Sequence, residues 1–303
     1  MNPVKNVCLL DGGLGQEIYR RASTANAYLW SVEVMRREPE VVQAVHRAYI
    51  DAGSTVCTLN TYAATPQRLA REGLGDSLEA IHLQALEICR AAIASSGKTI
   101  NIAGSLGPLI GSYRDEPSLT DEVMLNDYRR LCAAQDGVDL FLIETMTNSR
   151  EAMAACQAAS ETGLPYSLGI RVEANGQLRS GESLLEVIER AMVYQPSAVL
   201  INCSEPEITT QIMPKLASCG LPFGAYANGF VSVEALPNGQ TVDALERRQD
   251  VTIEAYTDWV LQWIEAGASV VGGCCEITPE HIDYLHRALA QRVKVGLWSE
   301  AVS

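Results

Sequence analysis

Three of the nine cysteines stand where thiols could act together on one target. Cys274 and Cys275 are adjacent and follow Gly272 and Gly273 at the end of an apolar run, and Cys203 ends another such run. Successive residues of a strand point to opposite faces, so the adjacent pair can converge only where the strand ends or bends. Glycines let backbone or a ligand come close at such a point. The pattern predicts three sulfurs gathered at the ends of two strands.

Three thiolates without a neighbouring histidine favour zinc as the target. Thiolates suit Zn²⁺, and three protein ligands with an open fourth position are typical of a catalytic zinc site. An iron–sulfur cluster would need four closely spaced thiolates, which the sequence lacks. A non-catalytic zinc or thiol-storage protein, or three buried thiols without a role, are the alternatives. The histidines fall in helical patterns and are interpreted as core or surface residues: His46, His82, His281 and His286.

Charge, hydropathy and the other thiols narrow the class of protein. A formal charge of −14 opposes nucleic-acid binding, which needs clustered lysine and arginine. No apolar run approaches the ~18 residues of a membrane span, and the first residues do not resemble a secretory signal. We therefore expect small-molecule partners, reduced thiols and a cytoplasmic location. Six cysteines are predicted to be structural: Cys8, Cys57, Cys89, Cys132, Cys156 and Cys219.

The elements that must position the three cysteines repeat one unit. Strand-like apolar runs that alternate with helical patterns predict a parallel sheet with right-handed crossovers. Eight such units match a (β/α)₈ (TIM) barrel, and the absence of a linker predicts one domain over residues 1–303. The predicted strands are 6–11, 54–60, 98–105, 140–145, 166–172, 198–204, 222–228 and 269–275. The clearest helical patterns are 39–53, 149–163, 206–220, 256–267 and 278–292.

Two other readings of an α/β chain are weaker. A doubly wound sheet would need a G-x-G-x-x-G turn after its first strand, and "DGGLGQE" lacks that spacing. A Schiff-base aldolase on a barrel would need a lysine at a strand end. None of the four lysines stands there: Lys5, Lys98, Lys215 and Lys294.

Polar or reactive residues follow most of the predicted strands. In a barrel these strand ends meet at one mouth, where active sites lie. Glu144 ends a fully apolar run, and a buried carboxylate needs a partner such as a bound ammonium. Asp11 could open onto the mouth or serve as a turn residue before two glycines. The strand-end residues are Asp11, Gly12, Gly13, Asn60, Thr61, Tyr62, Ser105, Glu144, Thr145, Arg171, Cys203, Asn228, Cys274 and Cys275.

The chain resembles the zinc-dependent homocysteine S-methyltransferases. The resemblance rests on "INCS" at strand six and on "GGCC" followed by "TPEHI" at strand eight. "LLDGG", "NTY", "AGSLGP", "IET" and "LRSGESL" occur in the family's order, and the likeness runs from about residue 9 to about residue 290. It implies a TIM barrel with one zinc and no cobalamin.

The resemblance also implies roles for individual residues. Cys203, Cys274 and Cys275 match the zinc ligands, and Asn228 resembles an element near the metal that could serve as a fourth ligand before substrate binds. Residues expected to contact substrate are Asp11, Gly12, Trp30, Thr61, Tyr62 and Glu144, the last of which would hold the substrate's ammonium. The sequence departs from the family's pattern at Ala227, Gly229, Glu276 and Ile277.

The implied reaction is methyl transfer to the thiol of homocysteine, which gives methionine. The compact chain favours S-methylmethionine, or S-adenosylmethionine, as the methyl donor. Betaine and dimethylsulfoniopropionate are alternative donors, and selenocysteine or selenohomocysteine alternative acceptors. We expect a monomer or a small homo-oligomer.

Overall fold

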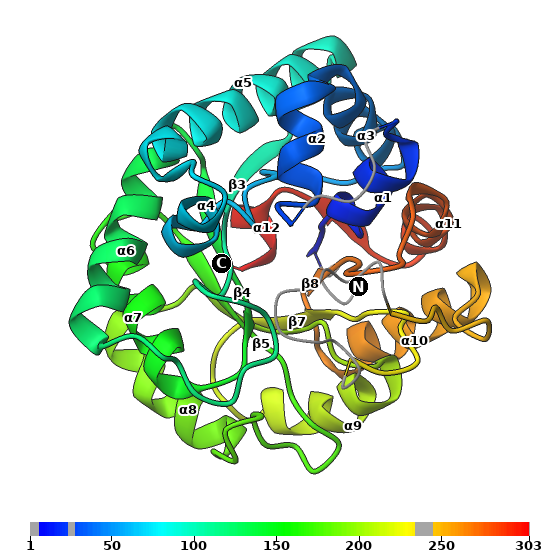
Figure 1. The fold of residues 1–303 in the computed structure, drawn as a ribbon. Helices are drawn as coiled ribbons and strands as arrows, with labels where there is room; N and C mark the ends of the chain where they lie inside the picture. The colour runs from blue at the N-terminus through cyan, green and yellow to red at the C-terminus, as the bar shows by residue number, and fades with distance from the viewer. Residues whose placement is uncertain (1–5, 24–27, 234–244, 303) are drawn as a thin grey trace.

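Nine parallel strands form one sheet in a computed structural model that describes residues 6–23, 28–233 and 245–302. The strand order is β2-β3-β4-β5-β6-β7-β8-β1-β9. Figure 1 shows the sheet curled at the centre of a ring of helices. The strands are β1 (Asn6–Leu9), β2 (Val56–Thr58), β3 (Asn101–Leu106), β4 (Leu140–Met146), β5 (Tyr166–Ile170), β6 (Ala198–Asn202), β7 (Phe223–Tyr226), β8 (Val270–Val271) and β9 (Lys294–Gly296).

The predicted barrel is confirmed, with one addition. All eight predicted strands overlap observed ones, and β9 is a ninth strand that pairs with the outer side of β1. The Thr55 N–H, just before β2, donates to the Leu9 carbonyl oxygen of β1 at 2.8 Å, which closes the ring of the first eight strands between β1 and β2. The strand ends therefore meet at a single mouth.

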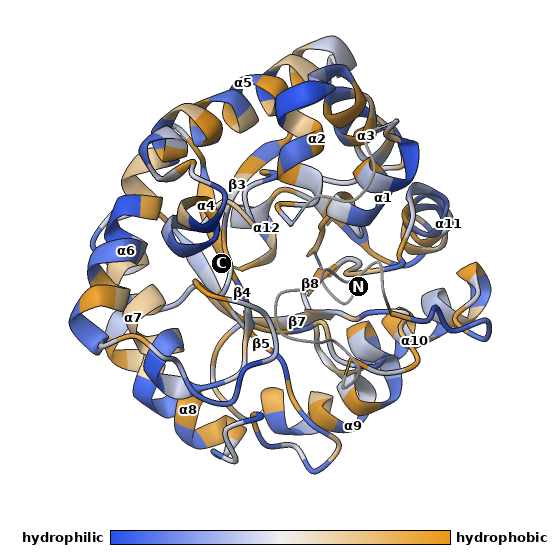
Figure 2. Cartoon of the chain, in the orientation of Figure 1, coloured by the Kyte–Doolittle hydropathy of each residue, from blue (hydrophilic) through white to orange (hydrophobic). Residues whose placement is uncertain are grey.

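The helices lie outside the sheet, as crossovers between parallel strands require. Figure 2 shows that they carry both hydrophobic and hydrophilic residues, as expected of helices with one face on a core. They are α1 (Leu14–Arg21), α2 (Ser31–Arg37), α3 (Pro39–Asp51), α4 (Pro66–Arg71), α5 (Leu78–Ser96), α6 (Asp121–Ala134), α7 (Ser149–Ser160), α8 (Leu184–Ala191), α9 (Pro206–Leu216), α10 (Ile253–Ala266), α11 (Pro279–Leu289) and α12 (Trp298–Ala301). Within the described ranges, none of them is both long and apolar enough to cross a membrane.

Alternation along the strands separates two cores. Val7 and Leu9 of β1 pack in the large core with the surrounding helices, whereas Cys8 and Leu10 pack in a smaller one inside the barrel. Trp298 of α12 belongs to the inner core, and α12 lies near the middle of the ring in Figure 1. The interior is thus packed, and open space is left at the mouth.

Candidate metal centre and substrate cavity

The structure brings the three predicted sulfurs together at the mouth. The Cys274 Sγ lies 3.0 Å from that of Cys203, and the Cys275 Sγ lies 3.9 Å from each of the other two. A tetrahedral zinc with Zn–S bonds of about 2.3 Å sets its sulfurs about 3.8 Å apart. Two of the three separations fit that value, and the third needs to open by less than 1 Å. The donor set therefore suits zinc.

Two turns direct the sulfurs toward one another. Cys203 leaves β6 in the left-handed conformation, with φ 53°, and its N–H donates to the Tyr226 carbonyl at 3.1 Å. Strand β8 ends before the cysteine pair, and the Ile277 N–H closes a turn onto the Cys274 carbonyl at 3.2 Å. The strand therefore ends and turns at the adjacent cysteines, as their convergence on one point requires.

The glycines of two loops let the cysteine turn approach β1. The Gly13 N–H donates to the Ile277 carbonyl at 2.8 Å. A Cβ on Gly12 would lie 2.2 Å from that same oxygen, and one on Gly273 would lie 2.3 Å from the Ile277 side chain. Both positions must therefore lack a side chain for the loops to touch.

Tyr113 completes the surroundings of the sulfurs, and the sequence reasoning missed it. Its buried hydroxyl lies 3.1 Å from the Cys203 Sγ, and the Arg171 guanidinium lies 5.5 Å from the centre of its ring. Hydrogen bonds from the thiols of Cys274 and Cys275 hold the pKa of Cys203 well below its usual range. The same contacts raise the pKa of Cys274, so three thiolates can coexist here only beside a cation.

Most of the residues predicted to bind metal or substrate line one cavity of about 110 Å³. It lies at the mouth of the barrel, between the cysteine turn, the loops after β1, β2 and β3, and strand β4. Its lining includes Asp11, Gly12, Trp30, Tyr62, Glu144, Cys203, Cys274 and Cys275.

Two carboxyl groups face this cavity, that of Asp11 buried and that of Glu144 partly buried. Asp11 accepts hydrogen bonds from the N–H and the hydroxyl of Thr58, both at 2.8 Å, and burial raises its pKa to about 6. Glu144 accepts from the hydroxyls of Ser105 at 2.5 Å and Tyr226 at 3.3 Å, and burial raises its pKa to about 7. Two acids beside three thiols make the cavity suited to a positively charged group.

Two predicted residues face elsewhere. Thr61 is absent from the cavity lining, and its buried hydroxyl donates to Gln135 at 3.0 Å, so its expected contact with substrate is not supported. The Asn228 side chain is buried beside the metal centre, where its amide donates to the Cys203 carbonyl at 2.7 Å. Its oxygen accepts from the Phe230 N–H at 3.0 Å.

Residues with strained, left-handed backbone conformations cluster at the same mouth of the barrel. Six non-glycine residues of the described chain have a positive φ. Four of them line the cavity, namely Trp30, Tyr113, Thr145 and Cys203, and a fifth, Glu276, follows the cysteine pair. Conformations of this kind persist where the surroundings hold them and cluster at functional sites.

A second group of possible ligands lies away from the mouth. Cys57 on β2 contacts the His46 Nδ1 on α3 at 3.1 Å, and Cys89 on α5 lies within reach of both. All three are buried, and none lines the cavity. Burial raises the pKa of Cys57 and lowers that of His46 to about 4, so these two side chains are neutral at neutral pH without a metal. Cys57 and Cys89 are thus buried, as expected of structural thiols.

Fold and site together define a (β/α)₈-barrel enzyme with thiols and carboxylates at its mouth. Residues 8–289 match the homocysteine S-methyltransferase family, and the chain belongs to that family. The resemblance noted in the sequence is therefore confirmed.

Individual relatives support the same assignment. The chain is 29% identical to homocysteine S-methyltransferase of Escherichia coli over 92% of its length and 94% of the relative's. It is 28% identical to selenocysteine methyltransferase of Astragalus bisulcatus over 93% and 92% of the two chains. The metallated form of the Escherichia coli homocysteine methyltransferase MmuM superposes with a TM-score of 0.79, at 27% identity over 93% of this chain and 96% of that one.

Proposed function

We propose that the protein transfers a methyl group from S-methylmethionine, or from S-adenosylmethionine, to the thiol of homocysteine and so makes methionine. The observation that carries the proposal is the cluster of three sulfurs in one cavity with the carboxyl groups of Asp11 and Glu144. The named activities of the Escherichia coli and Astragalus relatives support a thiol or selenol acceptor. Selenocysteine is therefore the alternative acceptor to test.

The three thiolates of Cys203, Cys274 and Cys275 would hold one zinc ion. The chemistry that zinc supplies is activation of the acceptor, because coordination deprotonates a thiol that is otherwise mostly protonated at neutral pH. Three thiolates surround the metal with excess negative charge, which keeps an acceptor sulfur electron-rich. Cobalamin is not part of the proposal.

Glu144 would bind the ammonium of homocysteine. Its partly buried carboxylate lines the cavity that holds the sulfurs, and the hydroxyls of Ser105 and Tyr226 fix its orientation. Asp11 would line the other side and add negative charge. Trp30 and Tyr62 would form aromatic walls around the substrates.

A cationic donor fits this site electrostatically. As the methyl group moves, the negative acceptor sulfur and the positive onium lose their charges, so a dry cavity favours the transition state over the ground state. The reaction needs no general base, and no histidine is among the described residues that line the cavity. Positioning of the two substrates in line is the remaining requirement.

Asn228 would lend its amide oxygen to zinc before homocysteine arrives. Zinc favours four ligands, and a weak amide ligand would be displaced by the substrate thiol. The Asn228 oxygen accepts one hydrogen bond, from Phe230, and a carbonyl oxygen has a second lone pair. A substrate-free zinc structure with water or another side chain in the fourth position would contradict this role.

We further place the protein in the cytoplasm as a monomer or small homo-oligomer that acts on small molecules. The support for this setting is the cysteine pattern, in which all nine cysteines are free in the structure, and the strong negative charge. Fractionation of cells that produce the protein tests its location, and light scattering of the purified protein tests its oligomeric state.

A donor panel tests the reaction. Zinc-loaded protein is incubated with homocysteine and, separately, S-methylmethionine, S-adenosylmethionine, betaine and dimethylsulfoniopropionate, and methionine is measured. Methionine is expected with S-methylmethionine, more slowly with S-adenosylmethionine, and without added cobalamin. Turnover with betaine alone would overturn the donor assignment and leave the acceptor in place. Turnover of selenocysteine but not homocysteine would change the acceptor, and methionine from no donor would contradict the proposal.

A further inference from the structure

Glu276 occupies a strained position directly beside the metal centre. It follows Cys275 in the chain and has φ 67°, a conformation that glycine adopts without strain. Its side chain is only 12% exposed, although it is charged. A buried charged residue in the left-handed conformation needs strong local partners to hold it there.

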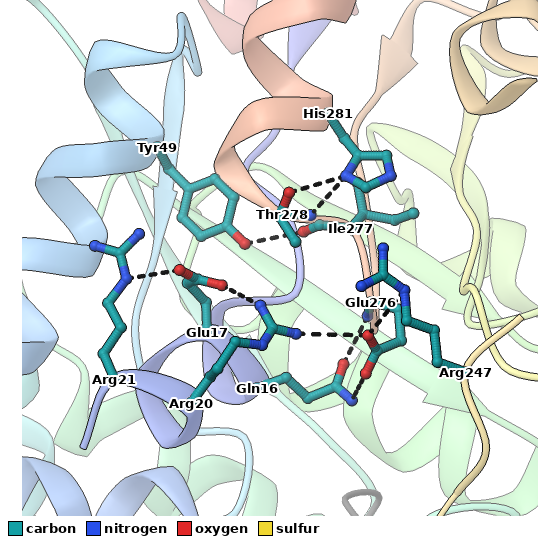
Figure 3. A network of polar contacts seen from close by, with 10 residues as sticks. All are labelled: Gln16, Glu17, Arg20, Arg21, Tyr49, Arg247, Glu276, Ile277, Thr278 and His281. Carbon is teal, nitrogen blue, oxygen red and sulfur yellow. Dashed lines mark hydrogen bonds and ion pairs between the residues drawn. The ribbon is translucent and has the colours of Figure 1, made fainter. Parts of the chain in front are cut away.

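Gln16 of α1 holds Glu276 with both ends of its amide group. The Gln16 oxygen accepts from the Glu276 N–H at 2.6 Å, and the Gln16 amide donates to the Glu276 carboxylate at 2.5 Å (Figure 3). Gln16 itself lines the substrate cavity. One amide therefore fixes both the backbone and the side chain of the residue that follows the cysteine pair.

Two arginines bind the other oxygen of the same carboxylate. Arg20 of α1 and Arg247 each place a guanidinium nitrogen 3.5 Å from the Glu276 Oε2, from different sides in Figure 3. Arg247 also pairs with Phe230 in an antiparallel bridge. Phe230 packs in one apolar cluster with Cys203 and the cysteine pair. Through Arg20 and Arg247, Glu276 thus connects α1 to the Phe230 segment (residues 229–231), which packs against the cysteines.

Gly229 of that segment makes room for Glu276. A Cβ on Gly229 would lie 3.0 Å from the Glu276 Cβ, and the Gly229 N–H donates to the Cys275 carbonyl at 2.9 Å. Two of the four positions at which the sequence departs from the family's pattern, Gly229 and Glu276, are therefore in contact beside the Cys275 peptide.

We propose that Glu276 is a positioning residue of the metal centre: through Gln16, Arg20 and Arg247 it fixes the turn that carries Cys275 and so sets the affinity for zinc. The inference rests on the proposed function for the identity of the metal. Glu276 does not touch the metal or the substrates in this account. Glu276 would affect zinc affinity through the backbone of the cysteine turn and through the Phe230 segment that packs against it.

Zinc affinity measured by competition with a chromogenic chelator tests the proposal in the absence of both substrates. Glu276→Gly removes the carboxylate and leaves a residue that is relaxed at φ 67°, so the variant is expected to fold and to bind zinc at least tenfold more weakly. Glu276→Gln keeps a hydrogen-bond acceptor for Gln16 but loses both ion pairs, and an intermediate loss is expected. Glu79→Gln, which removes an exposed ion pair with Arg130 on the outer helices, is the matched control and should match the wild type.

Two further readouts separate positioning from general destabilisation. The cobalt-substituted protein should show a changed ligand-field spectrum in Glu276→Gly, whereas a purely structural loss would alter only the melting temperature. If Gln16 and Glu276 act together, the double variant Gln16→Ala with Glu276→Gly should lose less zinc affinity, in free energy, than the sum of the losses in the two single variants.

The outcomes distinguish this inference from the proposed function. Wild-type zinc affinity in folded Glu276→Gly, together with an unchanged cobalt spectrum, would overturn the positioning role. If that variant does not fold, wild-type affinity in Glu276→Gln would overturn it instead. Zinc binding without methyl transfer would overturn only the proposed function, and a wild-type protein that binds no zinc would overturn both.

Discussion

Serine in place of Cys203, Cys274 or Cys275 is expected to remove zinc from the protein and to lower the rate of methyl transfer. The loss of rate should exceed roughly 10–100-fold, which is the usual cost of removing a residue that only hydrogen-bonds to a metal ligand. Each cysteine contributes one of three mutually close sulfurs, and a hydroxyl is a poor substitute for thiolate toward zinc. The fold should persist, because all three residues pack in a small cluster at the mouth and only Cys274 also packs against the inner core, at its edge as a partly buried residue.

Metal analysis and thermal unfolding of the purified, reduced variants check this result. Cys219→Ser is a suitable control, because Cys219 is a partly buried thiol outside the metal centre. Cys57→Ser asks whether the second ligand group binds metal, and one zinc per chain is expected to remain in it. Full zinc content in any of the three mouth variants would remove that cysteine from the proposed ligand set.

Glu144→Gln is expected to weaken homocysteine binding by about 1.5–3 kcal/mol, or roughly 10–150-fold, the usual value of a charged hydrogen bond. The change keeps the shape of the side chain and removes the charge that would pair with the substrate's ammonium. Zinc content should stay the same, because Glu144 is not among the three clustered thiols. Binding measured by calorimetry on the zinc-loaded variant decides the point, and wild-type affinity would make Glu144 a structural residue only.

The pH dependence of the same variant gives a second measure. Burial raises the pKa of Glu144 to about 7, so the carboxylate is present above that pH and protonated below it. Homocysteine affinity of the wild type should therefore fall as pH decreases from 8 to 6, and the part due to Glu144 should be missing in Glu144→Gln. Equal pH profiles for the two proteins would contradict this assignment.

The stability of the substrate-free protein should depend on pH in the opposite direction to homocysteine affinity. The folded protein holds a proton on Glu144 up to about pH 7, whereas the unfolded chain loses it near pH 4.5, so this group makes the substrate-free protein less stable as pH rises through that window. The full cost is about 3 kcal/mol. Glu144→Gln should thus melt at a higher temperature than the wild type at pH 8, and a lower melting temperature would contradict the direction of the pKa shift.

Strand periodicity was enough to predict the barrel and the place of the cysteines. Parallel strands that alternate with helices leave their carboxyl ends at one mouth, so any reactive residue that follows an apolar run becomes a candidate. Cys203 and the cysteine pair were predicted in this way, 71 residues apart in sequence and 3.0 Å apart in space at their nearest sulfurs. Strand β9 was missed because three residues carry no periodic signal.

The finer arrangement of the mouth depends on loops, whose side-chain directions no periodicity predicts. Thr61 and Tyr62 are neighbours after β2, yet only Tyr62 lines the cavity. Tyr113, a loop residue in the left-handed conformation, contacts the Cys203 sulfur through its hydroxyl. The contact of Glu276 with Gln16 joins residues 260 positions apart. Each of these placements follows from tertiary packing rather than local sequence.

X-ray absorption at the zinc edge, recorded before and after addition of homocysteine, tests most directly the claim that three thiols at the mouth hold a metal that accepts a substrate thiol. We expect three sulfurs and one lighter atom around zinc in the free protein, and four sulfurs once homocysteine binds. An identical sulfur count in both states, or a shell of two sulfurs with a histidine nitrogen, would contradict it, and the latter would place the metal at His46, Cys57 and Cys89 instead.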